Sequence, residues 1–144
     1  MGKIVLVDGS GSMGEEGKKS VVRYLLYSIE GLLQDEWAEM PFEIFMAAEE
    51  VEKFDGKLNV CGHINEKKLE NFLQSETEST LLFMTDGSLS EGVRQVLRKA
   101  TNRILILMVG CDCNRIRLRK LTNEDDLYES KDVASCVSKF ASIT

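Results

Sequence analysis

Proline and histidine are scarce in this sequence, with one residue of each among 144. Disordered tails and stiff linkers are usually rich in proline, so its scarcity argues against both. No apolar run approaches the ~20 residues that a membrane-spanning helix needs. The remaining composition, 43% hydrophobic and 29% charged, is that of an ordinary globular protein. We therefore expect a single ordered domain over residues 1–144, with no membrane as its partner.

Positive charge is also in short supply. Lysine and arginine number 18 against 24 acidic residues, which gives a formal net charge of −6 and a pI near 4.9. Nucleic acids and anionic membranes usually bind a basic surface. The one basic cluster, Arg115 to Lys120, is followed by the acidic Glu124, Asp125 and Asp126, which indicates a solvated surface of mixed charge. Nucleic acid is therefore not the expected partner.

The four cysteines are too sparse for a disulfide scaffold. Cys111 and Cys113 are spaced like half of a zinc site, but such a site needs four ligands and no second close pair exists. No export signal is evident, because Lys3 leads directly into a strand-like run. We therefore expect a cytoplasmic protein whose thiols remain reduced.

Short apolar runs predict the strands of a central sheet. They lie at residues 3–7, 42–48, 80–84 and 104–109. Alternation over residues 49–54 predicts a more exposed strand that turns back beside the second run at the sheet edge. Leu127 and Tyr128 indicate a minor strand near the end of the chain.

Helical periodicity is clearest over residues 18–34, where the apolar residues recur on one face and Lys18 is predicted to lie off that face. Shorter helical patterns begin near Asn65, follow Ser88, and close the chain over residues 133–141. The spacing of Ser88-Leu-Ser-Glu91 is that of a capping box. Residues 115–121 fit either a short helix or an extended segment.

Strands that alternate with helices predict an α/β fold. We expect a doubly wound, mostly parallel central sheet with one antiparallel edge strand and helices on both faces. Ligands of such sheets bind beyond the carboxyl ends of the strands, where the winding reverses. The loops after Val7, Met84 and Val109 are therefore the places to look for a site.

Two of these strands end at an acid. Asp8 opens the segment Asp8-Gly-Ser10-Gly-Ser12, and Asp86 lies in Thr85-Asp86-Gly87. Adjacent strands are about 4.8 Å apart, so neighbouring positions in the sheet would bring the two acids together. Carboxylates and hydroxyls are hard oxygen ligands that suit Mg²⁺. The sequence therefore predicts a divalent metal site formed by Asp8, Ser10, Ser12 and Asp86.

These motifs resemble the metal-ion-dependent adhesion site of von Willebrand factor A domains, and the order of elements is similar over nearly the whole chain. The resemblance implies that Ser10 and Ser12 ligate Mg²⁺ directly. It also implies that Asp8 and Asp86 act mainly through water or hydrogen bonds, and that a partner's carboxylate completes the octahedron. The chain would be a compact member, similar to bacterial intracellular ones.

One part of the family pattern is missing. The family usually supplies a threonine just before the helix that precedes the fourth strand, and His63 stands at the matching place here. Imidazole is a poorer ligand for Mg²⁺ than for softer metals. His63 as a metal ligand therefore implies Mn²⁺ or another divalent cation, a water-bridged contact, or weakened binding. Asn65 is a lesser candidate, since its simpler role is to cap the following helix.

Two enzyme classes are alternatives. Gly9, Gly11 and Gly14 match the dinucleotide fingerprint of a Rossmann oxidoreductase, although its helix should open within the glycines and an acid should follow about 20 residues on. A metal-dependent hydrolase with Asp8 as nucleophile is the other, although Ser10 stands where a second acid would be needed.

The preferred hypothesis is a cytoplasmic adaptor that is not an enzyme. Its metal would bind an Asp or Glu of a protein partner. The resemblance implies that the partner belongs to an ATPase-linked or stress-response complex. The sequence indicates neither the identity of that partner nor an oligomeric state.

Overall fold

The computed structural model describes residues 2–15, 17–110 and 115–143, and the structural statements below concern these residues. Their strands form a single six-stranded sheet in the order β3-β2-β1-β4-β5-β6. The strands are β1 (Lys3–Asp8), β2 (Glu43–Ala47), β3 (Val51–Lys53), β4 (Thr80–Thr85), β5 (Ile104–Met108) and β6 (Leu127–Glu129).

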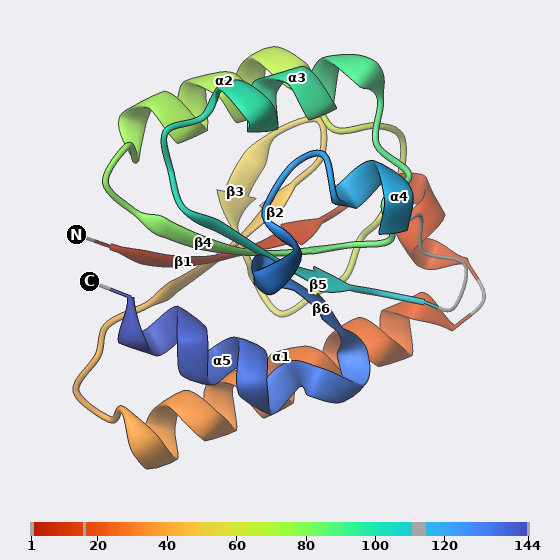
Figure 1. Ribbon diagram of the computed structural model, residues 1–144. Coiled ribbons are helices and arrows are strands. Elements are labelled where there is room, and N and C mark those ends of the chain that lie inside the picture. The colour runs from red at the N-terminus through yellow and green to blue at the C-terminus, as the bar shows by residue number, and fades with distance from the viewer. Residues whose placement is uncertain (1, 16, 111–114, 144) are drawn as a thin grey trace.

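Helices cover both faces of this sheet (Figure 1). They are α1 (Lys18–Glu36), α2 (Glu66–Ser75), α3 (Glu91–Lys99), α4 (Arg115–Leu118) and α5 (Val133–Ser142). The helices α1 and α5 pack together on one face, whereas α2 and α3 pack together on the other. None of the described helices is long and apolar enough to cross a membrane.

The buried strands supply side chains to two separate cores, because successive residues of a strand point to opposite faces. In β1, Val5 and Val7 join the core beneath α1 and α5, while Ile4 and Leu6 join the core beneath α2 and α3. The strands β4 and β5 alternate in the same way. Continuous apolar runs are therefore explained by helices on both sides of the sheet.

The topology confirms the predicted fold class. All neighbouring strands are parallel except β2 and β3, which pair antiparallel at the sheet edge as the sequence predicts. The strand β1 lies between β2 and β4, and Val7 is paired with Met84. The carboxyl ends of β1 and β4 are therefore neighbours, which is the condition that the predicted metal site requires.

Two details differ from the sequence prediction. Lys18 does not lie off the buried face of α1, since it is only 3% exposed. The cap of α3 is Ser90, whose hydroxyl accepts a hydrogen bond from the Val93 amide, and not Ser88. The Ser88 amide instead donates to the Asp86 carboxylate at 3.0 Å, so Ser88 belongs to the turn after β4. Cys111 and Cys113 lie outside the described residues.

Candidate metal centre

Asp8 is fully buried at the end of β1 and is held by hydrogen bonds. One carboxylate oxygen accepts from the Ser10 amide at 2.9 Å, and the other accepts from the Thr85 hydroxyl at 2.7 Å. Thr85 is the last residue of β4, and its hydroxyl also accepts from the Gly87 amide at 3.1 Å. The Asp8 carboxylate therefore ties the first loop to the end of the neighbouring strand.

Asp86, the residue after β4, lies beside this arrangement and is 2% exposed. Its carboxylate accepts hydrogen bonds from the Ser88 amide and from the hydroxyl of Ser12. It also accepts from the ammonium of Lys18, at 3.0 Å. The sheet thus brings Asp8 and Asp86 to one small region from opposite halves of the sequence.

The two serines lie between the acids. The Oγ atoms of Ser10 and Ser12 are 3.4 Å apart. Two ligands at right angles on an octahedral Mg²⁺, each about 2.1 Å from the ion, would be about 3 Å apart. Ser10 is hydrogen-bonded to Asp8 and Ser12 to Asp86, so each hydroxyl is oriented by its own carboxylate. This donor set fits a hard divalent cation.

A metal at this place would need the serine hydroxyls as ligands, because two acids are too few to hold it. No group of three or more His, Cys, Asp or Glu suited to a metal occurs in the described part of the chain. A metal held only by such residues, as in a structural zinc site, is therefore not indicated there. The candidate centre depends instead on neutral oxygen ligands, which leave more of the charge of the ion uncompensated.

The loop after β1 is held against a second loop. The Gly11 amide donates to the Gly62 carbonyl at 2.9 Å, and the Cys61 amide donates to the Gly9 carbonyl at 3.1 Å. Glycine at position 9 suits this close packing, because a Cβ atom would lie 3.0 Å from the Ala47 carbonyl oxygen. The segment that contains His63 is thereby placed beside the site.

His63, at the place of the family's threonine, and the lesser candidate Asn65 differ in their surroundings. His63 is exposed. Asn65 caps α2, since its side chain accepts a hydrogen bond from the Lys68 amide at 3.0 Å, which is the simpler role predicted for it. His63 as a metal ligand stays a prediction.

The two acids have opposite pKa shifts. Burial raises the pKa of Asp8 above its usual value against the hydrogen bonds from Ser10 and Thr85, and the nearby Asp86 adds to the rise. Burial also acts to raise the pKa of Asp86, but hydrogen bonds from Ser88, Lys18 and Ser12 outweigh it and leave that pKa lowered. A cation beside Asp8 would favour its charged form.

Lys18 is the residue at this site that sequence reasoning missed. It is the first residue of α1, and its ammonium lies 3.0 Å from the Asp86 carboxylate and 3.5 Å from the Ser12 carbonyl oxygen. Its side chain is 4% exposed. Helical periodicity gave no signal, because a lysine at the start of a helix is ordinarily solvated. Its position six residues after Ser12 was the only available clue.

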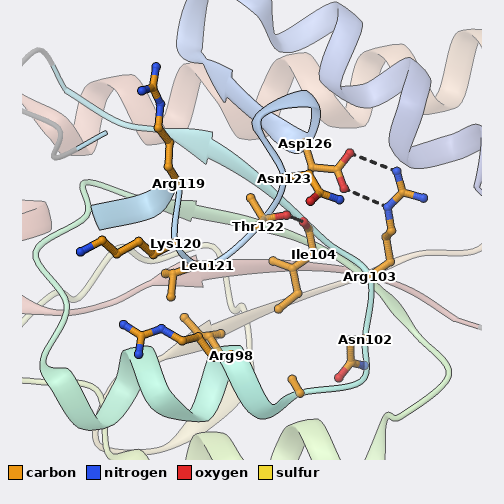
Figure 2. A pocket seen from close by; sticks show the side chains of 12 residues that line it. Arg98, Asn102, Arg103, Ile104, Arg119, Lys120, Leu121, Thr122, Asn123 and Asp126 are labelled. Atoms are coloured by element: carbon orange, nitrogen blue, oxygen red, sulfur yellow. Dashed lines mark hydrogen bonds and ion pairs between the residues drawn. The ribbon is translucent and has the colours of Figure 1, made fainter. Parts of the chain in front are cut away.

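A hollow lies at the opposite end of the sheet from the candidate metal centre, where α3 ends and β5 begins. It has a volume of about 410 Å³, and four of its five charged lining residues are basic. Figure 2 shows the Arg103 guanidinium against the Asp126 carboxylate, with N···O distances of 2.9 and 3.1 Å. Lys139 also contacts Asp126, at 2.7 Å. Arg103 and Asp126, two of the charged residues that line this hollow, are therefore already paired with each other.

Two residues of the basic cluster Arg115 to Lys120 are paired with an acid of the segment that follows it, in agreement with the sequence prediction. Arg115 and Arg119 each lie 2.8 Å from Glu124. The prediction of a solvated surface is wrong for Asp126, which is buried and paired with Arg103. These contacts support a role for the cluster in surface charge pairing.

Comparison with known proteins adds evidence on the fold. No family model and no curated protein matches the sequence. Among solved structures, manganese-loaded TRAP protein of Plasmodium vivax is similar with a TM-score of 0.73 and 13% identity, over 97% of this chain and 73% of that one. The VWA domain of SpRpn10 is similar with a TM-score of 0.56 and 10% identity, over 89% of this chain and 85% of that one.

A third similar structure is proximal thread matrix protein 1 of the mussel byssus, in a form with a zinc-occupied MIDAS motif. The TM-score is 0.63 at 18% identity, and the match covers 96% of this chain and 45% of that one. This chain therefore spans less than half of the mussel protein. With the strand order and the parallel pairing described above, these similarities show that the chain has a von Willebrand factor A-like fold.

Proposed function

We propose that this chain is a metal-dependent protein-interaction domain, which binds Mg²⁺ through Ser10 and Ser12 and uses it to hold a carboxylate of a partner protein. The observation that carries the proposal is the spacing of the two hydroxyls, 3.4 Å apart between two buried acids. Asp8 and Asp86 would orient these hydroxyls and balance the charge of the ion. Mn²⁺ or another divalent cation is an alternative occupant.

Two solved structures with a similar fold support a divalent metal as the ligand of this chain. The TRAP structure is manganese-loaded, and the mussel protein has a zinc-occupied MIDAS motif. Neither is Mg²⁺, so the choice of ion for this chain rests on its hard oxygen ligands. We propose a bound metal for this chain as well, because its hydroxyls and acids form a suitable donor set.

The chemistry of the site favours binding over catalysis. Ser10 is buried and Ser12 is half-buried, so an ion between them would be reached from the Ser12 side. Neutral hydroxyl ligands would leave the ion electrophilic, and an anionic oxygen of a partner would complete its coordination. We therefore propose an adaptor that is not an enzyme. Its cytoplasmic location and ATPase-linked or stress-response partner stay predictions.

The oxidoreductase alternative is less well supported by the local geometry. A dinucleotide fingerprint places its glycines at the start of the helix, which receives the pyrophosphate. Here a short 3-10 turn spans Gly11–Gly14, and α1 begins only at Lys18. The buried Asp8 and Asp86 would also repel a pyrophosphate. The hydrolase alternative lacks a second acid two residues after Asp8.

The proposal is tested by isothermal titration of Mg²⁺ and Mn²⁺ into the wild type and Asp8→Ala. We expect saturable binding to the wild type and a loss of affinity of about 10- to 100-fold in the variant, because Asp8 orients the Ser10 ligand. Asp35→Ala is the matched control, since it removes an exposed aspartate from the far end of α1. Equal binding by all three proteins would refute the site assignment.

A further inference from the structure

A buried lysine at a metal site needs an explanation, because a buried ammonium is costly unless it is paired. Lys18 is 3% exposed and points its ammonium at Asp86, one of the two acids of the candidate centre. The same ammonium is 3.5 Å from the carbonyl oxygen of Ser12. It therefore lies beside two of the residues that form the candidate centre.

The formal charges show what this arrangement does. Asp8 and Asp86 carry two negative charges when both are ionised, which would match one divalent ion. Lys18 offsets one of them, so the metal-free site retains a single negative charge. With both the ion and the ammonium present, the site would carry one positive charge instead. Like charges this close in a buried region repel strongly.

We infer that Lys18 is an internal competitor of the metal ion for the Asp86 carboxylate. The inference rests on the metal-binding function proposed above. In the metal-free protein Lys18 stabilises Asp86 and, through it, the Ser12 hydroxyl. When the ion binds, it has to displace this ammonium or accept its repulsion. Metal affinity is therefore lower than the oxygen ligands alone would give.

The same charge count indicates that the carboxylate of the protein partner helps to retain the metal ion. One additional carboxylate neutralises the positive charge that remains when the ion and Lys18 are both present. The ion and a carboxylate ligand therefore bind cooperatively, each raising the affinity for the other by the same factor. Lys18 thereby makes metal binding depend on the presence of an acidic ligand.

The test is calorimetric titration of Mn²⁺ into the wild type, Lys18→Met and Arg23→Met. Methionine keeps an unbranched side chain, one atom shorter than that of lysine, and removes the charge. Arg23→Met removes the same charge from an exposed position of α1. We expect Lys18→Met to bind Mn²⁺ at least about tenfold more tightly than the wild type, which lies within the usual range of coupling between sites. Arg23→Met should bind like the wild type.

A second arm repeats the titrations in sodium acetate and in sodium chloride of equal ionic strength. Acetate should raise the Mn²⁺ affinity of the wild type and should have a smaller effect on Lys18→Met. The absence of an acetate effect on the wild type would overturn the cooperative part of the inference. If Lys18→Met raised the Mn²⁺ affinity less than Arg23→Met does, the proposed competition between Lys18 and the ion would be overturned.

The outcomes separate this inference from the proposed function. Equal Mn²⁺ affinity in the wild type and Lys18→Met refutes competition but leaves the metal site in place. No Mn²⁺ binding by any of the proteins refutes the metal site and the inference together. If Lys18→Met folds only with Mn²⁺ present, competition is supported, because the ion then replaces the missing ammonium. If it does not fold at all, Lys18→Gln retains a hydrogen-bond donor for Asp86 without the charge and takes its place.

Discussion

Each end of the sheet contains a buried aspartate, and the two differ in their partners. Asp126 is bound by two cations, with Arg103 contacting both of its oxygens and Lys139 one of them. Asp86 has one cation, Lys18, and its other donors are an amide and a hydroxyl. A second buried acid, Asp8, lies beside Asp86, and its amide and hydroxyl donors are neutral.

This difference separates a structural ion pair from a candidate binding site. At Asp126, negative charge is fully offset by side chains of the protein. At Asp8 and Asp86, two acids face one ammonium, and the Oγ atoms of Ser10 and Ser12 lie 3.4 Å apart. Burial alone therefore does not identify a site. The local excess of negative charge beside hard oxygen ligands is what makes Asp8 and Asp86 the candidate site.

The largest effect is expected from removing both hydroxyls. Ser10→Ala combined with Ser12→Ala should lower Mn²⁺ affinity by more than about 100-fold, because both direct ligands are lost and the effect of one ligand-orienting group is already 10- to 100-fold. Titration calorimetry measures the change. Asp126→Asn should leave Mn²⁺ affinity unaltered, and a comparable loss in that variant would end the distinction between the two sites.

Asp126→Asn should instead reduce the stability of the fold. The asparagine keeps the shape of the side chain but loses the charge that Arg103 and Lys139 bind. We expect a loss of about 2 kcal/mol in the free energy of unfolding, as for hydrogen bonds to charged groups. Urea denaturation of the metal-free protein measures it. A variant as stable as the wild type would contradict the structural role of Asp126.

The stability contribution of Asp126 should depend on pH. Burial acts to raise its pKa, but hydrogen bonds from Arg103 and Lys139 outweigh this and hold the pKa below its usual value. A lowered folded-state pKa contributes stability above the unfolded value of about 3.9, and this contribution is lost as pH falls through the folded value. The difference in urea midpoint between wild type and Asp126→Asn should therefore shrink below about pH 4. A constant difference down to pH 2 would contradict the assignment.

The smallest effect is expected in α3, which joins the two ends of the sheet. Ser90→Ala should cost about 1 kcal/mol of stability, because it removes the cap on the Val93 amide. Ser88→Ala should cost less, since its amide and not its hydroxyl contacts Asp86. Thermal unfolding of the two variants compares them directly. Equal losses would show that Ser88 also caps the helix.

Much of the fold could be predicted from the sequence, because the buried strands are continuous apolar runs that end at Asp8 and Asp86. The adjacency of β1 and β4 then followed from the doubly wound pattern and from the family resemblance. The start of α3 was misplaced because Ser88 and Ser90 offer overlapping capping patterns. The hydrogen bond between Asp86 and the Ser88 amide decides between them, and this contact depends on the three-dimensional turn.

The candidate site could be predicted in part. The hydroxyls and acids were found from their spacing after predicted strands, but Lys18 was assigned to the exposed side of its helix. A lysine can bury its charge only where the fold supplies a counter-charge, and that carboxylate lies 68 residues away in the sequence. Periodicity within one helix carries no information on such a partner.

The most direct test of the account is anomalous diffraction from crystals grown with Mn²⁺. The account predicts one peak in contact with the Oγ atoms of both Ser10 and Ser12, at about 2.1 Å from each. The same map would show whether His63 faces the ion and whether the Lys18 ammonium has moved from Asp86. Saturating Mn²⁺ with no peak at these hydroxyls would contradict the proposed metal centre.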